Sequence, residues 1–310
     1  MNPLFSIVVP VYNRKDLVRR TLRSIECQTY RPLHVILVDN NSTDGSLQVL
    51  EQWAESVSTS DFSVSVFEEG RPGAAIARNR GLAEVKSEYM LFFDSDDEMR
   101  TDAVEHYMQE FIADPDLELV MNRSMRHNAN GSVSIIGPRR GNMMLNHIHH
   151  STLCTLGFAV RTSLVRRAGG WNESLHIWDD WELGIRLLLS VRKYKCLQYV
   201  ANDIYCTGDS LSGMNYSEKE PLYEAAIRAA ENSLASSALP DKDRLVCMMQ
   251  YRRIMLAAHF AGEGRTDLAF PLRDKALSGL GLRRRWLLRL AYAYIRRGGR
   301  GFDRIVNRLF

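Results

Sequence analysis

Short apolar runs alternate with helical patterns through the first 120 residues, and this alternation constrains the fold more than any other feature of the chain. Runs rich in β-branched and aromatic residues are typical of buried strands, whereas apolar residues three or four apart are typical of helices. Strands that alternate with helices form a mainly parallel sheet covered on both faces. We therefore expect an α/β fold. The expected strands are 6–11, 34–38, 64–67 and 89–93, and the helices between them include 17–27 and 74–85.

Polar clusters follow directly after these expected strands. Tyr12 and Asn13 follow the first, Asp39 to Ser42 follow the second, and Asp94 to Asp97 follow the fourth. Ligands of parallel sheets bind beyond the carboxyl ends of the strands. Three carboxylates within four residues repel one another unless a cation offsets them, and Mg²⁺ and Mn²⁺ prefer such oxygens. Asp94 to Asp97 therefore predict a metal site that a diphosphate would complete. The structural alternative is an acidic strand exit in which Asp97 or a neighbour caps the next helix.

A second acidic cluster begins a later helix. Asp179 and Asp180 precede leucines at helical spacing, so both should lie at a helix N-terminus, with Asp179 a candidate cap. The macrodipole there favours an ionised carboxylate, which suits a general base. Capping explains one Asp but not two, which lie between Trp178 and Trp181 and are followed by Glu182. The Trp rings are candidates for an acceptor platform or for core packing.

Two further segments are candidates for nucleotide contact. Asp39, at the tip of its strand, is placed to accept hydrogen bonds from a nucleoside, although the residues after it are also good helix caps. Gly70 to Gly81 is a small-residue turn that feeds a helix, and it does not match a phosphate loop. Arg78, one turn into that helix, is expected to face a nucleotide or a sheet-end carboxylate, with a surface position as the alternative.

The remaining chain divides into an irregular stretch and a helical region. We interpret residues 123–162 as a hairpin or flexible loop, and His147, His149 and His150 within it are candidates for metal or acceptor contact. From about residue 218 the pattern becomes helical. Helices are expected at 218–235, 241–262 and 266–277, and we expect them to form a small bundle.

Taken together, these pieces resemble the family 2 glycosyltransferases with the GT-A fold. The resemblance covers residues 5–215 and rests on six segments in the family's order. It implies a nucleoside-diphosphate sugar donor, a UDP-sugar in the first instance, and Mn²⁺ or Mg²⁺ as cofactor. The six segments are 7–13, 39–45, 73–81, 94–97, 169–171 and 178–183.

The resemblance also assigns roles to residues. Asp94 and Asp96 match the metal-and-diphosphate motif, and Asp180 matches the catalytic base, with Asp179 where the family has Glu. A base on the face opposite the leaving group implies inversion at the anomeric carbon. The residues expected to contact the nucleotide are Pro10, Tyr12, Asn13, Asp39, Asn41, Arg78, Asp94 and Ser95. Trp178, Asp179, Trp181 and Glu182 are expected to support the acceptor side.

One segment departs from the family. Many members carry a basic residue or a His near a Ser-Leu-Ser after the second acidic motif, and residues 205–212 carry neither. Closure over the diphosphate is therefore expected to use another residue.

The end of the chain is strongly basic. Residues 283–310 hold nine Arg and one acid, Asp303, a local net charge of +8, so the first 282 residues sum to −5 within the total of +3. Arginines mixed with aromatic and aliphatic residues predict an interfacial helix on an anionic membrane, or a packed terminal helix with an Arg-rich exposed face. We expect no nucleic-acid partner, because no recognised reading motif accompanies the arginines.

The sequence thus predicts a GT-A domain over 1–215 and a helical C-terminal region over 216–310. The expected activity is metal-dependent, inverting transfer of a hexosyl or N-acetylhexosaminyl group to a hydroxyl of a glycan or lipid-linked acceptor in surface polysaccharide synthesis. The alternatives are a catalytically silent, membrane-associated scaffold and a nucleotidyltransferase. No run of 18 uncharged apolar residues occurs, so we expect no spanning helix. Five scattered cysteines and the absence of a visible secretory signal favour a cytoplasmic protein, and one of the two interpretations of the basic tail makes it peripheral at the inner face of the membrane.

Overall fold

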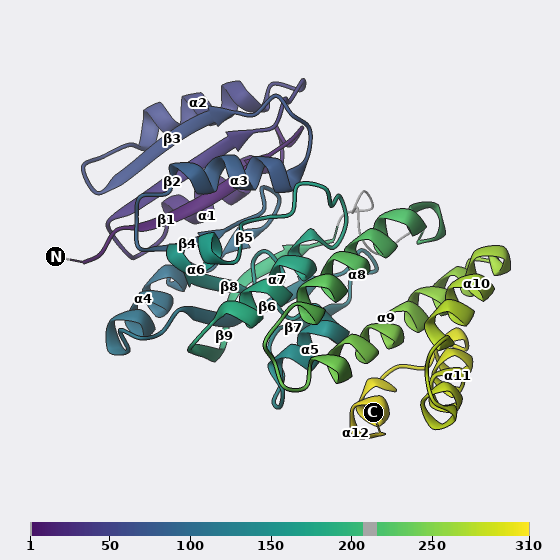
Figure 1. The fold of residues 1–310 in the computed structure, drawn as a ribbon. Coiled ribbons are helices and arrows are strands. Elements are labelled where there is room, and N and C mark those ends of the chain that lie inside the picture. The colour runs from purple at the N-terminus through teal and green to yellow at the C-terminus, as the bar shows by residue number, and fades with distance from the viewer. Residues whose placement is uncertain (1, 207–215, 310) are drawn as a thin grey trace. The chain divides into compact units, whose positions relative to one another are not determined.

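The computed structural model describes residues 2–206 and 216–309 of the chain (Figure 1). Two compact units can be distinguished. The first comprises Met1–Arg140 and Thr152–Asp209, and the second comprises Gly141–Ser151 and Ser210–Phe310. The boundary between functional domains, expected between 215 and 216, stays a prediction.

The first unit is built on a mixed sheet with the strand order β3-β2-β1-β4-β8-β6-β9-β5, and β7 pairs with β6. Its first half is parallel and consists of β1 (Phe5–Val11), β2 (Leu33–Asp39), β3 (Phe62–Glu68) and β4 (Tyr89–Phe92). These strands confirm the α/β fold expected from the alternation of apolar runs. Their parallel register brings the segments that follow β1, β2 and β4 to one edge of the sheet.

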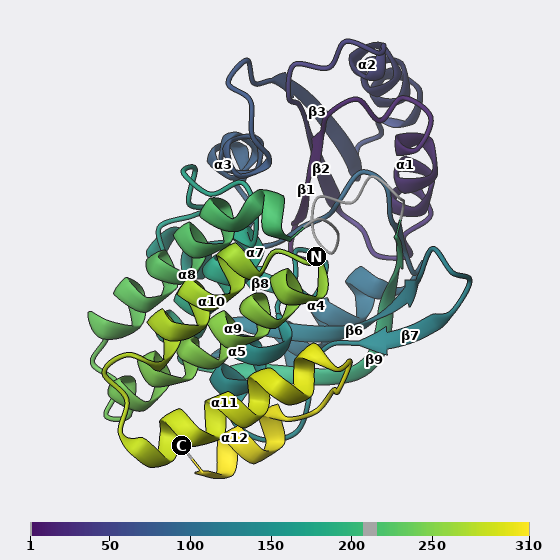
Figure 2. The same cartoon turned by 90° about the vertical axis from the view of Figure 1, so that its right-hand side faces the viewer.

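Helices cover both faces of this parallel half. α1 (Val18–Glu26) and α2 (Ser46–Val57) lie on one face and α3 (Ala74–Glu84) lies on the other (Figure 2). α1 buries Val18, Leu22 and Ile25, which fall on one side of a helix because they are four and three residues apart. α3 approaches the sheet so closely that a Cβ at Gly81 would clash with Val8. The small residues of this helix therefore serve close helix–sheet packing.

The second half of the sheet contains antiparallel pairs. β6 (Leu119–His127) and β7 (Val133–Ile136) form the expected hairpin, and β8 (Phe158–Arg161) runs antiparallel to both β4 and β6. β9 (Tyr194–Tyr205) runs parallel to β6, and its end pairs antiparallel with β5 (Glu98–Met99). The helices of this half are α4 (Ala103–Ala113), α6 (Thr162–Arg167) and α7 (Asp179–Ser190).

The second unit is helical, and α9 (Lys242–Gly262) lies at its centre. Around α9 pack α5 (Met143–His150), α8 (Glu220–Ala235), α10 (Thr266–Leu277) and α11 (Leu282–Arg296). A short turn, η1 (Ser217–Lys219), precedes α8, and α12 (Asp303–Leu309) contacts α11. Within the described part of the chain, no helix is both long enough and apolar enough to cross a membrane.

The interpretation of residues 143–150 as part of a loop was wrong, because they form α5. His147 is fully buried there. The ring Nε2 atoms of His149 and His150 lie 2.9 Å from Asn307 Oδ1 and 3.1 Å from Asp303 Oδ2, so both rings bind α12. These three side chains therefore serve packing within the helical unit.

Candidate active site

The turn that follows β4 carries the first acidic cluster at the carboxyl edge of the sheet. The Asp94 and Asp96 side chains are partly exposed, at 30% and 24%, and Arg14 Nε lies 3.4 Å from Asp96 Oδ2. Burial and the nearby Asp94 charge raise the pKa of Asp96. The turn thus presents two partly exposed carboxylates close together.

Asp97 points inward and does not cap a helix, so that alternative was wrong. Its Oδ1 accepts a hydrogen bond from the backbone N–H of Tyr205 at 2.8 Å. Burial and the charge of Asp94 raise the pKa of Asp97 to about 8. Most of the segment that departs from the family, residues 207–212, lies outside the described residues. Asp97 therefore ties the acidic turn to the strand that leads into that segment.

The loops after β1 and β2 are joined by hydrogen bonds. The backbone N–H of Asn13 donates to Ser42 Oγ at 3.0 Å, and Asn13 Oδ1 accepts from the backbone N–H of Thr43 at 2.8 Å. Asn13 and Asn41 both have positive φ, at 49° and 62°, a region in which Asn is enriched over most residues. These hydrogen bonds therefore hold the two loops together next to the exposed Tyr12.

Asp39 lies at the tip of β2 and is 2% exposed. Its Oδ2 accepts from the backbone N–H of Ser42 at 2.9 Å. Its Oδ1 is buried and has no hydrogen-bond partner among the described residues. A buried carboxylate oxygen without a donor costs free energy, and a ligand hydroxyl or N–H would remove that cost.

Arg78 connects the two acidic clusters. Its Nη2 donates to Asp94 Oδ1 at 2.8 Å, and its Nη1 donates to Asp179 Oδ2 at 2.9 Å. The guanidinium lies over the Trp171 ring, 4.3 Å from the centroid. The prediction that Arg78 faces a carboxylate at the end of a strand is therefore confirmed, with Asp94 as that carboxylate, and the alternative of a surface position was wrong.

α7 places the second acidic cluster opposite Arg78. The N-cap position is occupied by Trp178, with φ of 55°, and Asp179 is the first helical residue, so the prediction that Asp179 caps the helix was wrong. Asp180 Oδ1 accepts from the backbone N–H of Trp181 at 2.7 Å. Burial and the adjacent Asp179 charge raise the pKa of Asp180 to about 7. A carboxyl group with this pKa can accept and release a proton near neutral pH.

The remaining members of the second cluster have structural contacts. Glu182 is 2% exposed, and both of its oxygens accept from Arg186, at 2.7 Å and 2.6 Å. Arg186 also donates to the carbonyl oxygens of Ala168 and Gly170, so this pair holds the turn before Trp171. Trp181 is fully buried, as expected for core packing. The Trp178 ring is half-buried, 5.5 Å from that of Trp181, and it alone of the two can reach an acceptor.

Two asparagines, the buried Asn40 and the half-buried Asn79, hold the site through hydrogen bonds to the backbone. Asn40 donates to the carbonyl oxygens of Glu69 and Arg71 and accepts from the backbone N–H of Gly73. Asn79 both donates to and accepts from the backbone of Trp171. The sequence indicates both asparagines by their position. Asn40 directly follows Asp39 at the end of a strand, and Asn79 directly follows Arg78 in the first turns of a helix.

The acidic turn fits a divalent cation with few protein ligands. Burial and the charge of Asp94 both raise the pKa of Asp96, and a bound cation would offset that charge. However, the described residues include no group of three or more His, Cys, Asp or Glu side chains arranged to hold a metal ion. Asp94 and Asp96 would therefore hold such an ion only together with oxygens from a ligand or water.

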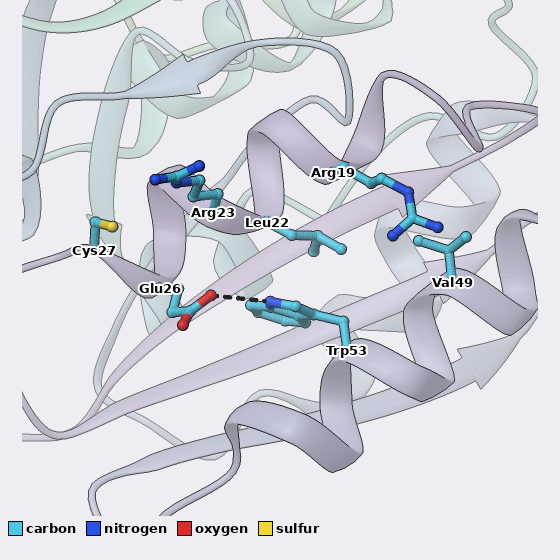
Figure 3. Close-up of a pocket in the computed structure, with 7 residues that line it drawn as sticks. All are labelled: Arg19, Leu22, Arg23, Glu26, Cys27, Val49 and Trp53. Carbon is cyan, nitrogen blue, oxygen red and sulfur yellow. Dashed lines mark hydrogen bonds between the residues drawn. The ribbon is translucent and has the colours of Figure 1, made fainter.

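A hollow of about 470 Å³ lies apart from these residues, between α1 and α2 (Figure 3). Within it Trp53 Nε1 donates to Glu26 Oε2 at 3.3 Å. None of the residues predicted for the site lines it, and its neighbours are mainly apolar or arginine side chains. Its lining residues are Arg19, Leu22, Arg23, Glu26, Cys27, Val49 and Trp53.

Residues 6–161 match the family model described as glycosyl transferase family 2, which is half of the chain. The chain belongs to glycosyltransferase family 2. Among curated family relatives, the chondroitin synthase of Pasteurella multocida is 26% identical over 236 residues, which cover 74% of this chain and 23% of the synthase. The match also covers only 57% of the glycosyltransferase GlyG of Streptococcus pneumoniae and 46% of the putative teichuronic acid biosynthesis glycosyltransferase TuaG of Bacillus subtilis.

Solved structures confirm the GT-A fold expected for this family member. Staphylococcus aureus TarS 1–349 in complex with UDP-GlcNAc is 21% identical, with a TM-score of 0.71, and the match covers 94% of this chain and 88% of TarS. A mannosyltransferase from Pyrobaculum calidifontis, in complex with GDP-Man and Mn²⁺, has a TM-score of 0.61 at 19% identity and covers 94% and 80% of the two chains. At these identities the likeness concerns the fold alone.

Proposed function

We propose that this chain is a metal-dependent, inverting glycosyltransferase that moves a sugar from a UDP-sugar to a hydroxyl of a glycan or lipid-linked acceptor. The observation that carries the proposal is the bridge through Arg78. Its guanidinium group contacts both Asp94, in the donor-side turn, and Asp179, at the start of α7. A donor diphosphate at the turn and an acceptor at α7 would then meet in one site.

In the proposed donor site, the nucleoside lies against the loops after β1 and β2. The unpartnered Oδ1 of Asp39 would accept a hydrogen bond from the base or ribose, and Tyr12, 58% exposed, would contact the base. The structure of TarS with UDP-GlcNAc supports a UDP-sugar as donor. The structure of the mannosyltransferase with GDP-Man makes a GDP-sugar the alternative donor to test. Pro10, Asn13, Asn41 and Ser95 remain proposed nucleotide contacts.

The proposed chemistry is a single displacement. Asp180, ionised, removes the proton of the acceptor hydroxyl while its oxygen attacks the anomeric carbon, and the electrons of the breaking bond pass to the diphosphate. A divalent metal held by Asp94 and Asp96 would offset the charge on that leaving group. Because attack comes from the face opposite the diphosphate, the anomeric configuration inverts.

The acceptor is proposed by class only. A relative that is a chondroitin synthase supports a growing polysaccharide as acceptor. An acceptor held on a lipid carrier would bring the enzyme to an anionic membrane surface. A silent scaffold would keep the same fold but would not turn over donor, which the experiment below distinguishes.

The test is calorimetric titration of UDP with and without Mn²⁺, together with donor hydrolysis in the same buffer. UDP affinity should rise with Mn²⁺, and the rise should be lost in Asp96→Asn, because that carboxylate would hold the ion. Asp116→Asn is the matched control, since Asp116 is an exposed acid distant in sequence from the turn. Equal UDP affinity with and without Mn²⁺ would refute the metal bridge, and absent hydrolysis would favour the scaffold.

A further inference from the structure

α11 has a buried face and an exposed apolar face. Leu287, Leu288, Ala291 and Tyr292 are buried within the helical unit. On the opposite side, Leu282, Trp286 and Leu290 are 83%, 64% and 40% exposed. Large, exposed apolar side chains gathered on one helix face are typical of an interaction surface.

The arrangement of charges around this face is specific. At about 100° per residue, Leu282, Trp286 and Leu290 fall within an arc of about 80°, with Arg289 and Arg296 on one side of the arc and Arg283 on the other. These three arginines are exposed. Long arginine side chains on both flanks of an apolar ridge can extend to anionic groups while the ridge enters an apolar phase.

The sequence of α11 and the two residues around its end contains no acid. Residues 282–297 include six Arg and no Asp or Glu. The one acid of the following residues, Asp303, is 7% exposed, and its carboxylate lies 3.1 Å from His150. On α12 the exposed apolar residues Ile305 and Leu309 lie beside further arginines, Arg304 and Arg308.

We propose that the ridge of Leu282, Trp286 and Leu290, flanked by arginines, is an interfacial surface that binds the anionic headgroup layer of a lipid bilayer. The aromatic and aliphatic side chains enter the boundary between headgroups and acyl chains, and the arginines contact lipid phosphates. The inference rests on the proposed function in so far as a lipid-linked acceptor gives this surface a use.

Charge complementarity selects this occupant. A second copy of the chain would bring a face with the same positive charge and no acid, so its arginines would repel those of the first. A nucleic acid would attract the arginines but would leave the apolar ridge in water. Only an anionic bilayer offers both an apolar phase and phosphates at adjacent depths.

The test is co-sedimentation of the full chain with phosphatidylcholine vesicles that contain or lack phosphatidylglycerol, at low and high salt. Binding should require phosphatidylglycerol and weaken with salt. Arg289→Gln with Arg296→Gln should weaken binding about 30-fold, since each arginine near the surface contributes roughly a fivefold gain. Trp286→Ser with Leu290→Ser should weaken it at least about tenfold, because the ridge no longer enters the apolar layer.

The controls separate surface effects from general ones. Arg19→Gln with Arg23→Gln removes the same charge from exposed positions on α1 and should leave binding unchanged. All variants should keep the parental melting temperature, since the altered side chains are exposed. UDP affinity, measured in parallel, should be unchanged, so that loss of the donor site and loss of the lipid surface are distinguished.

Two results would overturn the inference. One is equal vesicle binding by the parent and by both double variants. The other is a parent that self-associates in light scattering and becomes monomeric in the Trp286→Ser, Leu290→Ser variant, which would assign the ridge to a second copy.

Discussion

At the scale of single residues, Arg78 determines how the two acidic clusters can coexist. Its side chain is 9% exposed, and burying a guanidinium is costly unless opposite charges surround it. Asp94 and Asp179 supply those charges, and the Trp171 face supplies a further favourable contact. The arginine in turn reduces repulsion between carboxylates that would otherwise destabilise the edge of the sheet.

Asp180→Asn tests the proposed base. The amide keeps the size of the side chain but cannot accept a proton, so turnover should fall by about 10²- to 10⁴-fold. UDP affinity should change little, because the base acts on the acceptor. The measurement is transfer rate and UDP affinity beside the parent.

Asp179→Asn is the neighbouring control. It weakens one of the two ion pairs of Arg78, so the free energy of unfolding should fall by about 2 kcal/mol, while turnover falls less than in Asp180→Asn. Near-parental turnover in Asp180→Asn would place the base elsewhere.

The pH dependence of kcat/KM tests the same residue independently. The base acts only when ionised, and burial beside Asp179 raises the pKa of Asp180 to about 7. The rate should therefore be constant above pH 8 and fall as pH decreases through 7, to about one hundredth of the plateau at pH 5. A profile that is flat between pH 5 and 8 would contradict an Asp180 base with this pKa.

At the scale of elements, α11 confirms the packed terminal helix with an Arg-rich exposed face, while the membrane surface stays a prediction. The helix packs with one face, as a terminal structural helix does, and exposes an arginine-flanked ridge on the other. Composition cannot distinguish these cases, because both use the same leucines and arginines. The distinction depends on which leucines face α9, and that is a property of the tertiary contacts.

Two leucine substitutions on α11 test this assignment of faces. Leu288 is fully buried, so Leu288→Ala should lower the free energy of unfolding by about 2–5 kcal/mol. Leu290 is 40% exposed, and Leu290→Ala should change the free energy of unfolding by about 0.5 kcal/mol or less. Thermal or denaturant unfolding of both variants gives the comparison. Similar costs at the two positions would show that the ridge is buried in solution.

Element prediction succeeded where local patterns were strong. β1, β2 and β4 are largely apolar runs, and the helices at 74–84 and 266–277 begin at the expected residues. It failed for α5, which lies in a stretch interpreted as a hairpin or flexible loop because that stretch holds Gly131, Gly137, Pro138 and Gly141. It also left β8 unassigned, because a strand of four residues depends on distant partners, here β4 and β6, more than on its own sequence.

At the scale of the whole molecule, the sequence alone determined the α/β class and the strand ends that carry Asp39 and Asp94 to Asp97. This was possible because parallel strands buried on both faces must be apolar, so polar residues mark their ends. It also supported the family, through six short segments whose order is itself a property of the sequence.

Only the tertiary structure decided which of these residues meet. Arg78 and Asp179 are 101 positions apart, and no local pattern encodes their ion pair, the second ion pair that Arg78 makes with Asp94, or the raised pKa of Asp180. Likewise, the pairing of His150 with Asp303 removes the one acid of the tail from its exposed surface. Such outcomes depend on burial and on charges from distant segments, and both exist only once the chain has folded.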